Sequence, residues 1–167
     1  MDIIFNVMSG QTFWKILLFL HFLLAVALLA AMTLQAVAVL MPVRQPAGNF
    51  IDHFRPVPPA SYVTMIIVLY AINFLLGAWV YVKYRTYVRI PMEQLGHWWT
   101  LGSFEFKEHV ASISMALLPA YWYFWRQQSL NSEFSSTRKW LTVLLAFIVW
   151  YAFINGHVAN DFRGVGS

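Results

Sequence analysis

The chain contains no cysteine, which excludes disulfide bonds, thiolate metal sites, iron–sulfur clusters, covalently attached c-type haem and thiol catalysis. Charged residues are also scarce, at 11% of the 167 residues, whereas a typical soluble domain has about a quarter. With 60% hydrophobic residues, the few charges cannot cover the surface of a soluble protein of this size. We therefore expect the lipid bilayer to be the solvent of this chain.

The charges that are present give little indication of a polar macromolecular partner. Eleven Lys and Arg residues stand against seven Asp and Glu, a net charge of +4, and they are scattered without a basic run. Nucleic acid is therefore not expected as a partner. The sequence also lacks a nucleophile elbow, a phosphate-binding glycine loop and paired catalytic acids at a recognisable spacing, so no enzyme class is indicated.

Hydrophobic residues gather in four blocks, at about 13–41, 61–82, 109–125 and 140–157. About 20 apolar residues in a helix cross a hydrocarbon core of about 30 Å. The third block is short and contains Pro119, which we expect to kink its helix. Tryptophan and tyrosine gather near the ends of the blocks, as is typical of membrane interfaces. We predict one all-α domain, an integral membrane four-helix bundle.

An even number of crossings places the N- and C-termini on the same side of the membrane. That side also holds the expected loop 83–108, whose Lys83, Arg85 and Arg89 directly follow the second span. Because positive charge next to a span favours the cytoplasmic side, we expect the termini on the cytoplasmic side.

Four of the five histidines are expected in the same half of the membrane. In the four-span topology His21 lies inside the first helix, His97 in the second loop, His109 at the start of the third helix and His157 at the end of the fourth. His53 belongs to the opposite side. His21 carries the most weight, because an ionisable side chain in an apolar helix is costly and usually functional.

Histidines that converge from different helices are what a bis-imidazole haem b site requires. Small residues at helical spacing after His109, namely Ser112, Ala116 and Ala120, would leave room for a flat ligand. Two imidazoles would serve as axial ligands, chosen from His21, His109 and His157. Basic residues could pair with the propionates, with Arg85 and Arg89 as the main candidates beside Lys83 and Arg163.

A non-haem metal site is a competing interpretation of the same region. Glu105 and His109 are four residues apart, as are His157 and Asp161, so each pair could share a helix face. Mixed nitrogen and oxygen ligands would suit iron, copper, manganese or zinc. The candidate metal ligands are His21, His97, Glu105, His109, His157 and Asp161.

Structural explanations compete with both kinds of site. A histidine in the membrane can hydrogen-bond a neighbouring helix, and a histidine at a helix end can be an ordinary interfacial residue. Glu105 and Glu108 beside Lys107 fit a solvated helix start, where acids complement the helix dipole. Asn73, in the middle of the second span, is expected to anchor another helix by a hydrogen bond.

The stretch Phe13-Trp14-Lys15-Ile16-Leu17-Leu18-Phe19-Leu20-His21, followed by an alanine- and leucine-rich helix, resembles the first helix of small bacterial four-helix membrane proteins of the cytochrome b561 and CopD-like kind. The resemblance covers the four-span layout and this one histidine motif. It implies a b-type haem and membrane electron transfer, with His21, His109 and His157 as the positions to test. Cytochromes that carry electrons across the bilayer typically place haem ligands in both halves, whereas this chain lacks intramembrane histidine in the second half.

The resulting hypothesis is a small membrane electron-transfer protein or subunit with one haem b near one face. It would exchange electrons with a quinone or a redox partner subunit. Two alternatives stay open: a non-catalytic accessory or assembly subunit of a larger membrane complex, and a protein that binds a non-haem metal.

Overall fold

The computed structural model describes residues 10–41, 59–126 and 132–162, and these residues are helical apart from short turns. Four helices are long: α2 (Gly10–Leu40), α4 (Val63–Tyr84), α6 (Trp98–Arg126) and α7 (Ser135–Phe162). The shorter elements are the 3₁₀ turn η1 (Pro59–Tyr62), the π-helical turn η2 (Arg85–Arg89), α5 (Ile90–Gln94) and the 3₁₀ turn η4 (Ser132–Phe134). The described residues are helical without strands, as predicted.

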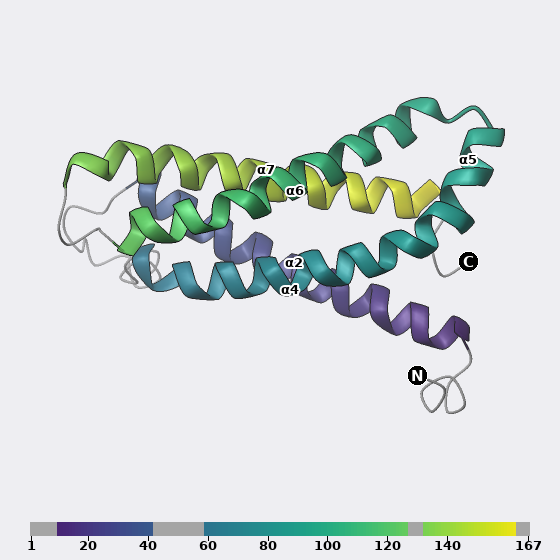
Figure 1. Cartoon of the computed structure of the whole chain (residues 1–167), viewed down its shortest axis with the longest axis horizontal. Helices are drawn as coiled ribbons and strands as arrows, with labels where there is room; N and C mark the ends of the chain where they lie inside the picture. The colour runs from purple at the N-terminus through teal and green to yellow at the C-terminus, as the bar shows by residue number, and fades with distance from the viewer. Residues whose placement is uncertain (1–9, 42–58, 127–131, 163–167) are drawn as a thin grey trace.

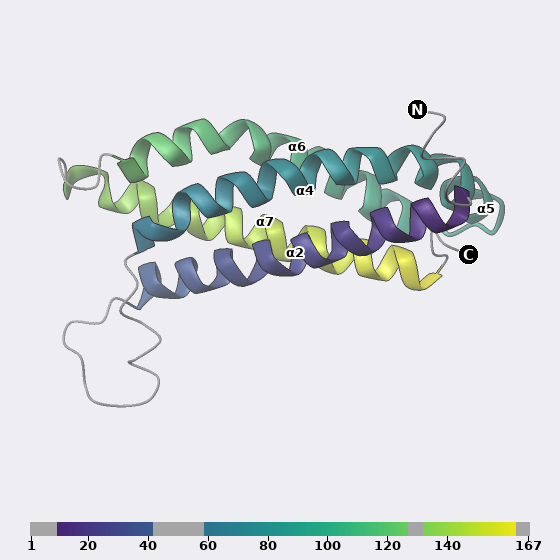
Figure 2. The ribbon, with the colours of Figure 1, turned by 90° about the horizontal axis from the view of Figure 1, so that it is seen from below.

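The four long helices lie side by side along the long axis of the molecule (Figures 1 and 2). α2 contacts α4 and α7, and α6 contacts the same two helices. The first residues of α2 and the last residues of α7 lie at the end of the molecule that carries α5 (Figure 1). The histidine-containing parts of α2 and α7 are thereby brought to the same end of the structure.

Three segments are long and apolar enough to cross a membrane: Gln11–Leu40, Ala60–Gln94 and Ser135–Asn160. α6 has a comparable length of 29 residues. It is more polar, however, because Glu105, Lys107 and Glu108 lie in its first half. Length and composition therefore suggest membrane association for the chain.

The expected loop 83–108 is wrong, because this segment is helical except at residues 95–97. α4 continues through η2 into α5, and α6 begins at Trp98 rather than at His109. The fourth helix is also longer than expected, so His157 does not close it. Charged residues end a hydropathy window, but Glu, Lys and Arg are good helix formers and do not end a helix.

Gly96 ends α5 and reverses the chain into α6. Its φ of 74° lies in the left-handed region, which glycine enters without the cost of a Cβ. The Gly96 amide donates to the carbonyl of Glu93 (3.1 Å), and the His97 amide donates to that of Met92 (3.0 Å). These two hydrogen bonds form a Schellman cap, which keeps the break between α5 and α6 to three residues.

The buried hydrophobic residues form two separate clusters. The larger cluster joins all four long helices and has Met32, Ile66, Tyr121 and Leu145 at its centre. The smaller cluster lies nearer α5 and consists of Leu17, Val80, Tyr84, Val88, Met92 and Leu101. The packing is therefore interrupted between them, at the level of the first part of α2.

Hydrogen bonds between side chains tie the long helices together. Tyr121 of α6 donates to Gln35 of α2, and both side chains are fully buried. Further pairs link α4 to α6 (Tyr70 and Ser114), α6 to α7 (Trp125 and Thr142, Ser103 and Asn155) and α2 to α7 (Trp150 and Thr33). Bonds of this type contribute about 0.6 kcal/mol on average inside membrane proteins, so they fix helix register more than they add stability.

Candidate functional site

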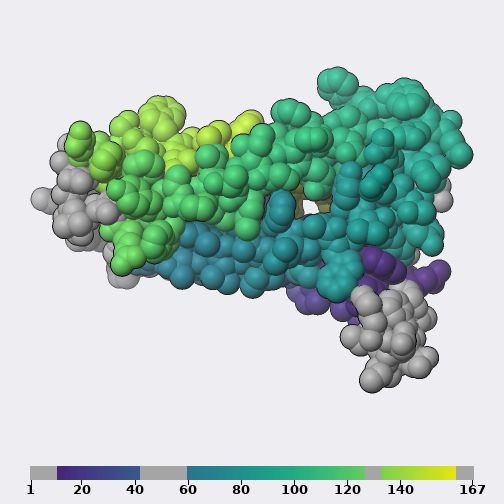
Figure 3. Space-filling model, viewed as in Figure 1, coloured from purple at the N-terminus to yellow at the C-terminus, as the bar shows by residue number. Residues whose placement is uncertain are grey.

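A cavity of about 490 Å³ lies between the four long helices. Its lining includes Leu28 and Val149 of the larger hydrophobic cluster, and Val80 and Val88 of the smaller one. The cavity therefore fills the interruption between the two clusters. Figure 3 shows an opening between the surfaces of α4 and α6. Small-molecule and cofactor sites commonly have volumes of about 300–1,000 Å³, so the cavity is large enough for such a ligand.

His21 enters the cavity from α2. It lies on the face of α2 that also carries the buried residues Leu28, Met32 and Gln35, so this face is the inward one. The ring rests against Gly77 of α4, where an added Cβ would be only 3.0 Å from the His21 Cε1 atom. The missing side chain at Gly77 thus provides the space that the imidazole occupies.

Three buried polar atoms of cavity residues have no hydrogen-bond partner among the described residues. They are Nδ1 of His21, Oδ1 of Asn73 and the hydroxyl oxygen of Tyr84. Buried polar atoms are normally satisfied by protein, water or a ligand, because leaving one unpaired costs about 1–3 kcal/mol. Oδ1 of Asn73 therefore makes no interhelical hydrogen bond with the described residues, and a polar ligand or water would satisfy atoms of this kind.

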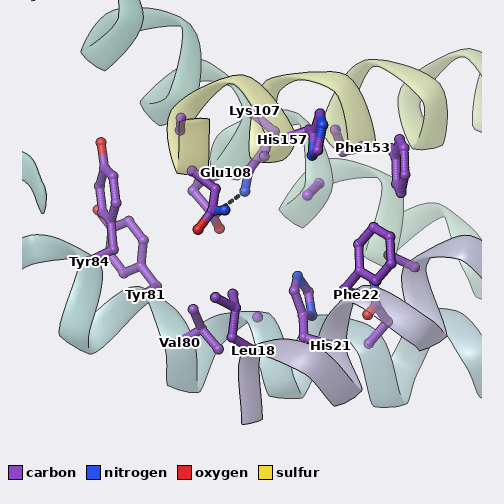
Figure 4. Close-up of a pocket in the computed structure, with 18 of the residues that line it drawn as sticks. Leu18, His21, Phe22, Val80, Tyr81, Tyr84, Lys107, Glu108, Phe153 and His157 are labelled. Atoms are coloured by element: carbon purple, nitrogen blue, oxygen red, sulfur yellow. Dashed lines mark ion pairs between the residues drawn. The ribbon is translucent and has the colours of Figure 1, made fainter. Parts of the chain in front are cut away.

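His157 lies on the opposite wall of the cavity, on α7, and its side chain is exposed at the edge of the cavity. Figure 4 shows the rings of His21 and His157 projecting from α2 and α7 toward the space between them. Phe22 and Phe153 lie beside them, with ring centroids 6.1 Å apart. Two imidazoles far apart in the sequence thus line the same cavity.

Lys107 and Glu108 of α6 form an ion pair that lines the cavity (Figure 4). Their side chains are 13% and 27% exposed, respectively. The Lys107 ammonium also lies 3.9 Å from the centroid of the Phe104 ring, a cation–π contact. The expectation that Lys107 and Glu108 belong to a solvated helix start is therefore wrong. α6 begins nine residues before Lys107, so the pair lies well inside the helix and lines the cavity.

Aromatic rings form the wall of the cavity nearest to α5. Tyr84 of α4 stacks on Phe104 of α6 at a centroid distance of 4.0 Å and on Tyr81 at 5.6 Å. Tyr81 donates a hydrogen bond of 3.0 Å from its hydroxyl group to the carboxylate of Glu105. The stack joins α4 to α6 across one end of the cavity.

His109 does not line the cavity. Its side chain is exposed, and its Nδ1 atom lies 2.7 Å from the backbone oxygen of Glu105, one turn earlier. Ser112 and Ala116, the small residues on the same face, are exposed as well. The inward face of α6 instead carries Ser114 and the buried Leu101, Leu118, Tyr121 and Trp125.

The other candidate ligands are also placed outside the cavity lining. Arg89 donates to Glu93 (2.7 Å) and to Glu105 (3.4 Å), whereas Arg85 and His97 are exposed. Glu105 directs its carboxylate to Tyr81 and Arg89, so it does not meet the His109 ring. Within the described part of the chain no group of three or more His, Asp or Glu side chains could hold a metal ion. The Asp161 side chain, Arg163 and His53 lie outside the described residues.

Gly77, Tyr84 and the Lys107–Glu108 pair were not expected at this site from the sequence. The pair lies directly before an apolar block, and this was a possible signal, because charged residues that fall within a membrane-spanning helix usually face the interior and mark function. It was missed because the helix was expected to begin after them. Nothing in the sequence indicated that Gly77 would meet His21, since this contact joins two helices.

No family model, curated protein or solved structure matches this chain. The function of the cavity is therefore to be inferred from the residues that line it.

Proposed function

We propose that this chain is a small integral membrane protein that binds one b-type haem between its helices and takes part in electron transfer. The observation that carries the proposal is the pair of imidazoles, His21 and His157, on opposite walls of a single cavity. A bound haem would supply one-electron redox chemistry. His21 and His157 would hold the haem through their imidazole nitrogens, and the largely apolar cavity would fix its orientation.

The residues present fit such a group. Nδ1 of His21 has no partner, while the backbone of Asn73 faces the same ring. A metal-binding histidine commonly has one ring nitrogen held by a backbone carbonyl while the other stays available. Small residues line the cavity near the two histidines and leave room for a flat ring: Gly77 and Ala78 of α4, and Ala152 and Gly156 of α7. Phe22 and Phe153 would exclude water from the edge of a flat ring.

In the membrane arrangement that we propose, all four long helices cross the bilayer as a bundle. The start of α2 and the end of α7 would then lie on the cytoplasmic side of the bacterial inner membrane. Support comes from the basic residues at this end of the molecule, Lys83, Arg85 and Arg89. The haem would lie in the cytoplasmic half, where a quinone or a redox partner subunit could exchange electrons with it.

An absorption spectrum tests the proposal. The full chain would be produced with haem available, purified in detergent, and analysed for haem and for metals. We expect a Soret band in the wild type, and its loss or displacement in His21→Ala and in His157→Ala. His109→Ala is the matched control, because this exposed imidazole lies outside the cavity, and its spectrum should equal that of the wild type.

Two outcomes would contradict the proposal. One is a wild-type protein without haem, and the other is a spectrum that changes in His109→Ala but not in the two cavity variants. A stoichiometric metal without haem would instead favour a non-haem site. If the metal is lost on replacing Glu105 or Asp161, the ligands would be the pairs expected from the sequence, Glu105 with His109 and His157 with Asp161.

A non-catalytic accessory subunit is the second candidate function. It is favoured by the aromatic start of α6, where Trp98 is 67% exposed and Trp99 is 90% exposed. Large exposed aromatic side chains are typical of protein interfaces as well as of membrane interfaces. This candidate predicts that the chain co-purifies with a larger membrane complex and lacks a cofactor.

A further inference from the structure

The Lys107–Glu108 pair places two opposite charges beside a cavity whose other walls are largely apolar. Charges removed from water are costly unless they are paired, and the pair compensates itself while no ligand is present. Neighbouring residues on a helix do not normally face each other, yet Figure 4 shows both side chains turned toward the same space. The arrangement keeps an ammonium group available in the cavity without leaving it unpaired.

We propose that Lys107 is the residue that recognises an anionic group of the cavity ligand, exchanging its partner Glu108 for a ligand carboxylate. This inference rests on the proposed function, in which the ligand is haem b and the anionic group is a propionate. An ammonium group binds a carboxylate by a charge-assisted hydrogen bond, which is about twice as strong as a neutral one. Within an apolar cavity the attraction is stronger than in water.

The position of Lys107 distinguishes it from the arginines expected from the sequence. Arg85 and Arg89 do not line the cavity, and Arg89 already binds two carboxylates, those of Glu93 and Glu105. Lys15 of α2 lines the cavity too, but its side chain is exposed. Lys107 is 13% exposed and is the better shielded of the two lysines, so its charge should act most strongly on a ligand.

The test compares two ligands that differ in charge only at the propionate groups: haemin, with two free carboxylates, and haemin dimethyl ester, which has none. Each is titrated into the ligand-free protein in detergent while the Soret band is followed. We expect the wild type to bind haemin at least about tenfold more tightly than the ester. Glu108→Gln should strengthen haemin binding and leave ester binding unchanged, because Lys107 loses its competing partner.

The double variant Lys107→Met/Glu108→Gln removes both charges, so neither is left unpaired in the cavity. It should bind the acid and the ester with equal affinity. Arg85→Gln is the matched control and should keep the wild-type preference for the acid. If the double variant keeps that preference, or if Arg85→Gln abolishes it, the role of Lys107 is overturned while haem binding stands. If the wild type shows a Soret change with neither ligand, both the inference and the proposed function are overturned.

Discussion

His21 and Gly77 are matched to each other across the contact between α2 and α4. An added Cβ at position 77 would lie only 3.0 Å from the His21 Cε1 atom, closer than an ordinary van der Waals contact. It would therefore push the ring toward the cavity that His21 lines. The position of the His21 ring therefore depends on Gly77, a residue without a side chain.

The Gly77→Ala variant should displace the His21 ring by a few tenths of an ångström. We expect haem affinity, measured by titration in detergent, to fall by about tenfold, equivalent to about 1.4 kcal/mol. Gly102→Ala is the control, since an added Cβ there meets nothing within 4 Å. It should bind haem normally, and alanine should favour the helix by up to about 1 kcal/mol. Equal haem affinity in the two variants would show that Gly77 does not position His21.

At the scale of the helices, two buried tyrosine hydroxyl groups differ in whether they have a hydrogen-bond partner. Tyr121 and Gln35 satisfy each other in the larger hydrophobic cluster, whereas the Tyr84 hydroxyl group at the cavity has no partner among the described residues. Losing a satisfied hydroxyl leaves its partner unpaired, but losing an unpaired hydroxyl removes a cost. The same chemical change should therefore have different consequences at the two positions.

Tyr121→Phe should lower the free energy of unfolding by about 1 kcal/mol, because it removes the buried hydrogen bond that Tyr121 of α6 donates to Gln35 of α2. Tyr84→Phe should leave the stability of the ligand-free protein unchanged or slightly increased. Unfolding of both variants can be followed by circular dichroism in detergent with increasing denaturant. A larger loss in Tyr84→Phe than in Tyr121→Phe would contradict the account of the cavity.

The sequence predicted the four long helices well but their ends less well. Hydropathy located α2 and α4 almost to their ends, but only the second part of α6 and the middle of α7. It stopped at the charges of α6, although Lys107 and Glu108 lie inside that helix, on its cavity side. Periodicity could not predict the orientation of His109, because α6 carries large apolar side chains on both its exposed and its buried faces.

At the scale of the whole molecule, the site required knowledge of which helices meet. His21 and His157, which we expected in the same half of the membrane, line one cavity. Gly77 and Lys107 became part of that site only through contacts between α2, α4 and α6. Such contacts join distant parts of the chain, and local sequence patterns do not encode them.

Because the chain has no cysteine, a single introduced cysteine reports membrane sidedness without background. Leu95→Cys marks the turn between α5 and α6, and Ser136→Cys marks the start of α7; both positions are exposed. If α6 crosses the bilayer, a membrane-impermeant thiol reagent applied to intact cells should label Ser136→Cys but not Leu95→Cys. Labelling of both, or of neither until the cells are broken, would mean that α6 does not cross.

The convergence of His21 and His157 is tested most directly by the electron paramagnetic resonance spectrum of the oxidised, haem-loaded protein. Two imidazole ligands make ferric haem low-spin, so the account predicts a low-spin signal in the wild type and in His109→Ala. Loss of either cavity histidine should convert it to a high-spin signal or release the haem. A high-spin wild type, or a low-spin signal that survives in both His21→Ala and His157→Ala, would contradict it.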